Sequence, residues 1–268
     1  MIKAVFTDID ETLTNSNREV TEKTCYQIKR CIEKGILIIL TSGRARKDAT
    51  NYQKQIGASP YIISSNGAYC YDELNGIEIF SEPIKKEVVK QLLEYAQENG
   101  YTIKFNYKDK IVLNKALFLD EKDKEKKVDE LKNIIETENI VQCIVSSSDI
   151  EKMMELKSYL AKNFHDVKIV NESKKLKNPE LKPSKNYYCD IASATISKGK
   201  AVHMICQYLN LSEEEIITIG DGENDISMFN ITPNSVAMGN ALEYIKRQAK
   251  YITLSNDENG VAKVLEKL

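Results

Sequence analysis

The stretch Gly220-Asp221-Gly222-Glu223-Asn224-Asp225 directly follows the apolar run Ile216-Ile217-Thr218-Ile219. β-Branched residues favour a strand, and the glycines beside Asp221 permit a tight turn and close approach of the backbone to a ligand. Asp225 follows Asp221 by four residues, about one helical turn. An acidic helix cap is the structural alternative. The stretch therefore predicts a buried strand that ends in an acidic turn and leads into a helix.

A second acidic group, Asp8-Ile9-Asp10-Glu11-Thr12, follows the apolar run Ala4-Val5-Phe6. Taken alone, a solvated acidic turn explains this group equally well. The carboxyl ends of parallel strands open into one crevice, however, so two acidic groups at two strand ends are expected to lie close together.

A calcium-binding loop competes for the same residues. Asp8, Asp10, Thr12 and Glu19 stand at the first, third, fifth and twelfth positions of an EF-hand pattern. The sixth position is Leu13 where the sharp turn needs glycine, and a strand-like run precedes Asp8. Both departures argue against this alternative.

Two further features add groups that can bind phosphate. A third strand-like run, residues 36–40, ends in Thr41-Ser42-Gly43-Arg44, where a hydroxyl and a backbone amide could donate to phosphate oxygens. Ser-Gly turns are common and usually structural. Lys198 begins a predicted helix at residues 198–209. A cation is disfavoured at a helix N-terminus, so a lysine held there needs a nearby anion.

Charge decides between these interpretations. Asp8, Asp10, Asp221 and Asp225 around one crevice would repel by roughly 4 kcal/mol per close pair at an effective dielectric near 20, and a bound phosphate would add to this. The site therefore requires cations. Oxygen ligands without histidine or cysteine favour Mg²⁺, with Lys198 as a fixed positive charge.

The two ends of the chain differ from its middle. Short apolar runs alternate with helical periodicity at both ends, which predicts an α/β fold with a Rossmann-like parallel sheet. Residues 187–191 are expected to be a strand of that sheet. The middle has two rounds of helix and strand, with a hairpin around Lys108-Asp109, and predicts an α+β unit. The expected organisation is a discontinuous core, residues 1–82 and 187–268, with an inserted α+β cap at residues 83–186; residues 174–185 are expected to be a loop.

Composition limits the possible partners and location. The chain has 268 residues and a formal charge of −2, which gives no excess positive field for nucleic acid or membrane. No apolar run is long enough for a signal peptide or a membrane span, so the expectation is a cytoplasmic protein, monomeric or weakly homodimeric. Six cysteines lie scattered without a CxxC pair and are expected to be free thiols. Only two histidines are present, which directs attention to the carboxylates.

Taken in this order, the motifs resemble those of the haloacid dehalogenase superfamily, and specifically its Cof-type phosphatases with a large α+β cap. DIDET is similar to the family's DxDxT, Ser42-Gly43-Arg44 to T-G-R, Lys198-Gly199 to the lysine motif and GDGEND to GDxxND. Ser65-Asn66-Gly67-Ala68 resembles a stretch that lies beside the active site in Cof-type members. Glu11 stands where glycine is commonest in the family, and Ser42 stands where threonine is commonest.

The resemblance implies a role for each matched residue. Asp8 would be the nucleophile and Asp10 the acid/base, with Ser42 and Lys198 stabilising the transferred phosphoryl group. Gly43, Arg44, Asn66 and Asn224 would bind phosphate or substrate. Mg²⁺ would be held by Asp8, the backbone carbonyl of Asp10, Asp221 and Asp225.

The function implied is hydrolysis of a small phosphorylated metabolite through an aspartyl-phosphate. Sugar phosphates, pyridoxal phosphate and flavin mononucleotide all remain open as substrates, because no cap residue matches a motif with readable chemistry. A sugar-phosphate mutase with the same fold is one alternative. A non-enzymatic metal- or phosphate-binding module is another, although the complete set of four motifs argues against it.

Overall fold

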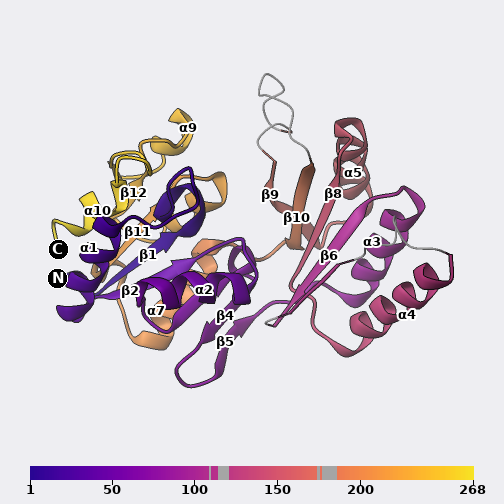
Figure 1. The fold of residues 1–268 in the computed structure, drawn as a ribbon, viewed down its shortest axis with the longest axis horizontal. Helices are drawn as coiled ribbons and strands as arrows, with labels where there is room; N and C mark the ends of the chain where they lie inside the picture. Colours follow the sequence, from indigo (N-terminus) through magenta and orange to yellow (C-terminus); the bar gives the residue numbers. More distant parts are fainter. Residues whose placement is uncertain (109, 114–120, 174–175, 177–185) are drawn as a thin grey trace. The chain divides into compact units, whose positions relative to one another are not determined.

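The chain forms two compact units in the computed structural model, one from Met1–Ser81 with Ser197–Leu268 and one from Glu82–Ile196 (Figure 1). The structure describes residues 1–268 except 109, 114–120, 174–175 and 177–185. The side chains of 111–113 and 121–128 are also outside the description. The loop expected at 174–185 therefore lies almost wholly outside the described residues.

The first unit contains an eight-stranded sheet in the order β13-β12-β11-β1-β2-β3-β4-β5. Its strands are β1 (Ala4–Asp8), β2 (Leu37–Thr41), β3 (Tyr61–Ser64), β4 (Tyr69–Asp72), β5 (Ile77–Ser81), β11 (Ile216–Gly220), β12 (Ser235–Ala237) and β13 (Tyr251–Ile252). From β13 to β3 all neighbours are parallel, and β4 and β5 add an antiparallel edge. This confirms the predicted α/β class and parallel sheet.

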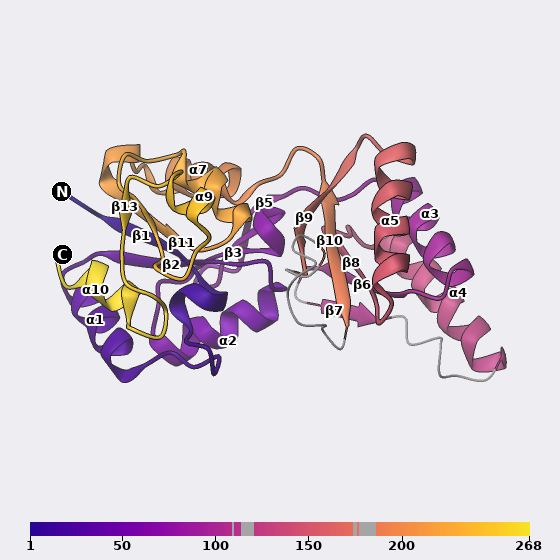
Figure 2. The same cartoon turned by 90° about the horizontal axis from the view of Figure 1, so that it is seen from above.

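Helices cover both faces of this sheet, as Figure 2 shows. One face carries α1 (Glu22–Glu33), α2 (Arg46–Ile56) and α10 (Gly260–Leu265). The other carries α7 (Lys198–Leu209) and α9 (Glu243–Lys246), and α8 (Ile226–Phe229) shares their apolar cluster. Short helical turns occupy Ile9–Leu13, Ser65–Gly67, Glu213–Glu215 and Glu223–Asp225. Each face has its own buried apolar cluster, so the strand ends are held on a rigid platform.

The second unit is a five-stranded antiparallel sheet with helices on one face (Figure 1). The order is β7-β6-β8-β10-β9, with β6 (Thr102–Tyr107), β7 (Lys110–Leu113), β8 (Gln142–Ser147), β9 (Val167–Glu172) and β10 (Tyr187–Ser193). Helices α3 (Lys86–Glu98), α4 (Glu121–Thr137) and α5 (Ile150–Asn163) pack on it through one apolar cluster. This unit is the α+β cap that the sequence predicts.

The prediction for residues 187–191 was wrong in one respect. They form a strand, β10, but it pairs antiparallel with β8 and β9 in the cap sheet and not with the parallel sheet. The alternation of the strand explains why: Tyr187, Cys189 and Ile191 join the cap core, whereas Tyr188 is exposed between them. Alternation is typical of an antiparallel sheet covered on one face, because strands of a doubly covered parallel sheet are apolar throughout. The second unit accordingly extends to Ile196, beyond the expected boundary at residue 186.

The hairpin of β4 and β5 was missed by the sequence interpretation. Its turn contains Asn75-Gly76, and Gly76 has a φ of +69°. Asp72 accepts from the backbone amides of Leu74 and Asn75 and so stabilises the turn. An Asn-Gly pair between two alternating runs is a recognised hairpin signal, so this element was predictable.

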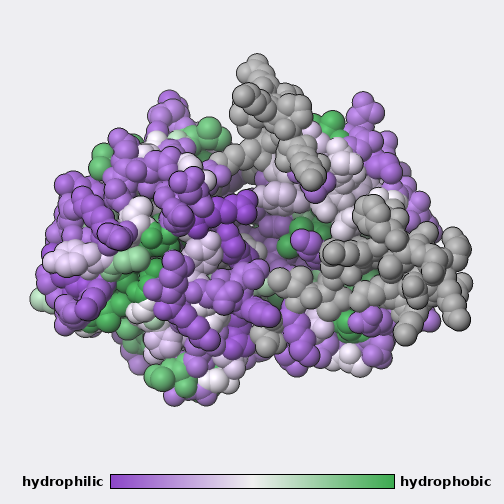
Figure 3. All heavy atoms as spheres, viewed as in Figure 1, coloured by the Kyte–Doolittle hydropathy of each residue, from purple (hydrophilic) through white to green (hydrophobic). Residues whose placement is uncertain are grey.

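Several expectations from composition can be compared with the structure. All six cysteines are free thiols, as expected. Hydrophilic side chains cover most of the described surface seen in Figure 3. Among the helices that the structure describes, none combines the length and apolar character needed to cross a bilayer.

Candidate active site

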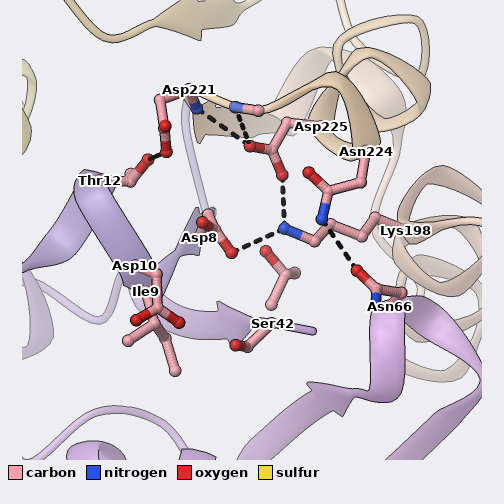
Figure 4. A network of polar contacts seen from close by, with 12 residues as sticks. Asp8, Ile9, Asp10, Thr12, Ser42, Asn66, Lys198, Asp221, Asn224 and Asp225 are labelled. Atoms are coloured by element: carbon pink, nitrogen blue, oxygen red, sulfur yellow. Dashed lines mark hydrogen bonds and ion pairs between the residues drawn. The ribbon is translucent and has the colours of Figure 1, made fainter. Parts of the chain in front are cut away.

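Two neighbouring strand ends of the first unit bring the acidic groups together (Figure 4). Asp8 is the last residue of β1, and Asp221 directly follows β11, the parallel neighbour of β1. Asp8, Asp221 and Asp225 each offer a carboxylate oxygen, and these oxygens all lie within 4.8 Å of one another. The predicted meeting of the two acidic groups at one edge of the sheet is therefore present.

Lys198 lies between two of these carboxylates. Its Nζ donates to Asp8 Oδ1 at 2.6 Å and to Asp225 Oδ1 at 2.5 Å, and its side chain is 1% exposed. Burial alone lowers the pKa of a lysine, but Asp225 and Asp8 outweigh it, and the pKa of Lys198 lies above its ordinary value. These carboxylates are the anions that a lysine at the first position of α7 requires.

Asp225 is fixed by the backbone as well as by Lys198. Its Oδ2 accepts from the amides of Asp221 at 3.0 Å and Gly222 at 2.8 Å. A Cβ on Gly220 would lie 2.4 Å from Cγ of Asp225. The first glycine of the motif is therefore needed for space, because any side chain there would displace this carboxylate.

The electrostatics of the cluster favour a bound cation. Burial raises the pKa of Asp8 most, Lys198 opposes this, and Asp225 and Asp221 raise it further. Three carboxylates against one ammonium leave an excess of two negative charges within a few ångströms. All the converging ligand atoms are oxygens, which suits a hard divalent ion. The residues thus fit a divalent metal ion.

Thr12 contributes to the cluster in a way that the sequence interpretation did not assign. Its hydroxyl donates to Asp221 Oδ1 at 2.7 Å, which orients that carboxylate. The chain reaches Thr12 through Glu11, whose φ is +58°. This left-handed conformation is the one that glycine adopts most readily, which accounts for the family's preference for glycine there. Because β1 and not a helix precedes this turn, the EF-hand alternative lacks its first helix.

Arg44 has a different partner from the phosphate expected for it. Its Nε donates to Asp10 Oδ2 at 2.8 Å and its Nη2 to Asp10 Oδ1 at 2.6 Å, and the guanidinium lies 5.0 Å from the ring centroid of Tyr52. The hydrogen bond to Asp10 raises the pKa of Arg44. Figure 4 shows the Asp10 side chain pointing away from the three clustered carboxylates. An acid/base role for Asp10 therefore requires it to exchange Arg44 for another partner.

Ser42, Asn66 and Asn224 lie around the carboxylates and Lys198 (Figure 4). Ser42 is fully buried, and its Oγ accepts from the amide of Arg44 at 3.1 Å. Asn224 Nδ2 donates to Asn66 Oδ1 at 2.8 Å, which joins the two asparagines across the fold. A Cβ on Gly43 would lie 3.0 Å from the Asn66 side chain. Close packing at Gly43 thus keeps its backbone beside Asn66.

Known proteins resemble this chain in both sequence and fold. The family model of haloacid dehalogenase-like hydrolases matches residues 5–265. The Bacillus subtilis protein named phosphatase YwpJ is 26% identical, with 100% of each chain covered. The Bacillus subtilis 5-amino-6-(5-phospho-D-ribitylamino)uracil phosphatase YwtE is 25% identical, with 100% of this chain and 98% of that protein covered.

A solved structure agrees with this relationship. A haloacid dehalogenase-like hydrolase from Bacteroides thetaiotaomicron has a TM-score of 0.83 and 26% identity, covering 100% of this chain and 99% of that one. Together with the strand-end carboxylates and the buried lysine, the matches establish that the chain belongs to the haloacid dehalogenase-like hydrolases, in their Cof-type phosphatase branch.

Proposed function

We propose that the protein is a magnesium-dependent phosphatase that hydrolyses small phosphomonoesters through a phosphoryl group carried on Asp8. The observation that carries the proposal is the position of Asp8, which is buried at the end of β1 beside Lys198, with Asp221 and Asp225 within reach of one ion. A carboxylate held in this way is fixed in direction and is close to positive charge, as a nucleophile toward an anionic substrate must be.

Phosphoryl transfer begins at Asp8. One carboxylate oxygen of Asp8 forms a bond to phosphorus while the bond from phosphorus to the ester oxygen breaks. Lys198 and the Ser42 hydroxyl stabilise the charge on the non-bridging oxygens, and a bound magnesium ion would lower the repulsion between Asp8 and the dianion. Asp8, Asp221 and Asp225 would hold that ion, together with the backbone carbonyl of Asp10.

Asp10 would move the protons in both half-reactions. It would give its proton to the departing ester oxygen and later take one from the water that attacks the phosphoryl group, which releases phosphate and restores Asp8. In the structure its carboxylate is paired with Arg44, so the reaction requires Asp10 to leave this pair and reach the substrate oxygen.

The substrate class that we favour is a phosphomonoester of a sugar or of a compound with a sugar-like chain. The name of the YwtE relative includes a phosphorylated ribityl chain, which is a polyol. Pyridoxal phosphate and flavin mononucleotide belong in the same screen, because the catalytic groups described above would act on the phosphoryl group and the ester oxygen and not on the rest of the leaving group.

The test is release of inorganic phosphate from a panel of phosphomonoesters by the full-length protein, with magnesium and with EDTA. Turnover is expected only with the metal. Asp8→Asn is expected to reduce turnover by at least about 10⁴-fold, because it removes the nucleophile. Asp129→Asn, at an exposed position of α4, is the matched control and should retain full activity. Undiminished turnover by Asp8→Asn would refute the assigned nucleophile.

A further inference from the structure

The turn that follows β1 carries groups of the proposed site on a strained backbone. It spans Ile9–Leu13 and supplies Asp10 and Thr12 (Figure 4). Between these two residues, Glu11 has a φ of +58° and a ψ of 9°, which lies in the left-handed region. A residue with a Cβ is strained in this region and keeps the conformation only where its surroundings hold it. Contacts from outside the turn must therefore hold Glu11.

Asn240 makes such a contact with Glu11 itself. It lies just after β12, and its Nδ2 donates to the backbone carbonyl oxygen of Glu11 at 2.9 Å. Its Oδ1 accepts from the backbone amide of Asn256 at 3.0 Å. Because a carbonyl only accepts and a backbone amide only donates, the two partners together fix the direction of the Asn240 amide. The donor of Asn240 is thus directed at the strained residue.

The backbone beside Asn240 is closely packed. The amide of Gly239 donates to the carbonyl oxygen of Leu254 at 3.0 Å. A Cβ on Gly239 would lie 2.7 Å from the backbone nitrogen of Ser255, so the two segments touch through their main chains. Asn240 therefore extends from a segment that is fixed within the sheet of the first unit.

Asn256 holds the end of the same turn. It is 9% exposed, and its Nδ2 donates to the carbonyl oxygen of Thr14 at 3.0 Å. The amide of Thr14 in turn donates to the carbonyl oxygen of Ile9 at 2.9 Å, which closes the turn. Since Asn256 also donates to Asn240, one connected network holds both the strained residue and the closing residue of the turn.

The conformation of Glu11 matters for two groups of the proposed metal site. The planar peptide group between Asp10 and Glu11 carries the Asp10 carbonyl, which is expected to bind the ion. Rotation of Glu11 out of the left-handed region would turn this peptide group. It would also displace Thr12, whose hydroxyl orients Asp221. Relaxation of one residue would therefore disturb both groups together.

We propose that Asn240, supported by Asn256, is a positioning residue that holds Glu11 in its left-handed conformation. It thereby keeps the Asp10 carbonyl and Thr12 in place for a divalent ion. This inference rests on the proposed function and deepens it. It has a specific consequence: Asn240 is needed only while residue 11 has a Cβ, because glycine adopts the left-handed conformation without strain.

The test is a double-mutant cycle that combines Asn240→Ala with Glu11→Gly in the full-length protein. The first readout is the dissociation constant of Mn²⁺ without substrate, measured by electron paramagnetic resonance. Mn²⁺ takes the same carboxylate and carbonyl ligands as Mg²⁺, and this readout does not depend on turnover. The second readout is kcat together with the magnesium concentration that gives half-maximal turnover. Asn163→Ala is the matched control, because Asn163 is also exposed and its Nδ2 also donates to a backbone carbonyl.

Asn240→Ala is expected to weaken Mn²⁺ binding by about 10-fold, since loss of a group that orients metal ligands typically costs 10- to 100-fold. The magnesium requirement should rise by a similar factor, whereas kcat at saturating magnesium should fall by less than about threefold. Glu11→Gly alone should stay within about twofold of the wild type. In the Glu11→Gly background, Asn240→Ala should weaken binding by less than about threefold. The control should match the wild type.

Asn240→Asp is a second variant that separates the hydrogen bond from packing. It keeps the shape of the side chain and the acceptor for Asn256, but it faces the Glu11 carbonyl with an acceptor instead of a donor. Its added negative charge would by itself strengthen cation binding. Weaker Mn²⁺ binding by this variant therefore reports the lost donor, and binding as tight as in the wild type would overturn the inference.

The cycle separates the inference from the proposed function. Equal losses from Asn240→Ala in both backgrounds would show that Asn240 does not act through Glu11, and no loss in either would show that it positions nothing. Absence of Mn²⁺ binding by the wild type would refute the metal site and the inference with it. If the cycle gives the expected coupling but the wild type hydrolyses no ester, the inference is supported and the proposed function fails.

Discussion

Replacing Lys198 by methionine tests the electrostatic design of the site. Methionine keeps much of the length and apolar volume of lysine but removes the ammonium that donates to Asp8 and Asp225. Three carboxylates would then face one another with oxygens within 4.8 Å and no described cation between them. At that separation each ionised pair repels by about 3.5 kcal/mol at an effective dielectric near 20.

The expected cost is smaller than the sum of all pairs. Burial already raises the pKa of Asp8, so the variant can take up a proton there and remove two of the three repulsive pairs. Loss of one member of a buried ion pair typically costs about 3–5 kcal/mol, and we expect a loss of that size in the free energy of unfolding without metal. Phosphatase activity should fall by about 10²–10³-fold, because the fixed charge beside the transferred phosphoryl group is gone.

The assay is urea denaturation of the wild type and the variant in EDTA and again in magnesium. A divalent ion bound by the folded state should restore part of the lost stability in the variant, by about 2.7 kcal/mol at a hundred times its dissociation constant. Lys29→Met, at an exposed position of α1, is the control and should change stability little. If Lys198→Met is as stable as the wild type in EDTA, the carboxylates do not repel as described and the argument for a required cation fails.

Two other substitutions test local features of the first unit. Gly220→Ala would place a Cβ 2.4 Å from Asp225 Cγ and so displace this carboxylate. We expect kcat to fall by about 100-fold while the circular dichroism spectrum shows a retained fold. An unchanged kcat would contradict the spatial role of this glycine. Glu73→Gln removes a carboxylate whose pKa is lowered chiefly by the hydrogen bonds from Arg46. The ionised Glu73 stabilises the fold above the ordinary glutamate pKa, and this stabilisation is lost as pH falls through the lower pKa of the folded state. The variant should therefore be about 1 kcal/mol less stable than the wild type at pH 7 in urea titrations, and this deficit should shrink as pH falls below the ordinary glutamate pKa; a deficit that does not change with pH would exclude an ionic cause.

The sequence was sufficient for the strands that carry the site. β1, β2 and β11 are largely apolar and almost wholly buried, as expected of parallel strands covered on both faces, and each is followed by or ends in polar residues whose types suit phosphate chemistry. Because parallel strands share one carboxyl edge, the meeting of Asp8 and Asp221 follows from topology once the three are placed in one sheet. The position of Lys198 was also predictable, since an ammonium at a helix N-terminus is costly without an anion.

Other features depend on tertiary contacts that a linear pattern does not contain. β10 was assigned to the wrong sheet because a short run of apolar residues fits a strand of either sheet. Only the exposure of Tyr188 reveals that buried and exposed side chains alternate along this strand. Arg44 pairs with Asp10, which lies 34 positions away in the chain. A guanidinium binds a phosphate and a carboxylate in the same way, so the sequence alone does not reveal which of the two is its partner. The pairing of Asn106 with Gln142, which leaves one atom of each without a partner among the described residues, can be identified only after β6 and β8 are aligned in register.

The two units place different demands on their polar residues. In the first unit, Asp225 and Lys198 are held by fixed partners, which keeps their charges in one geometry for the proposed reaction. In the second unit, Asn106 and Gln142 each keep one buried atom that has no hydrogen-bond partner among the described residues, and an unpaired buried group costs about 1–3 kcal/mol. The contrast supports placing the proposed phosphoryl chemistry on the parallel sheet of the first unit, where the charged groups are fixed in one arrangement.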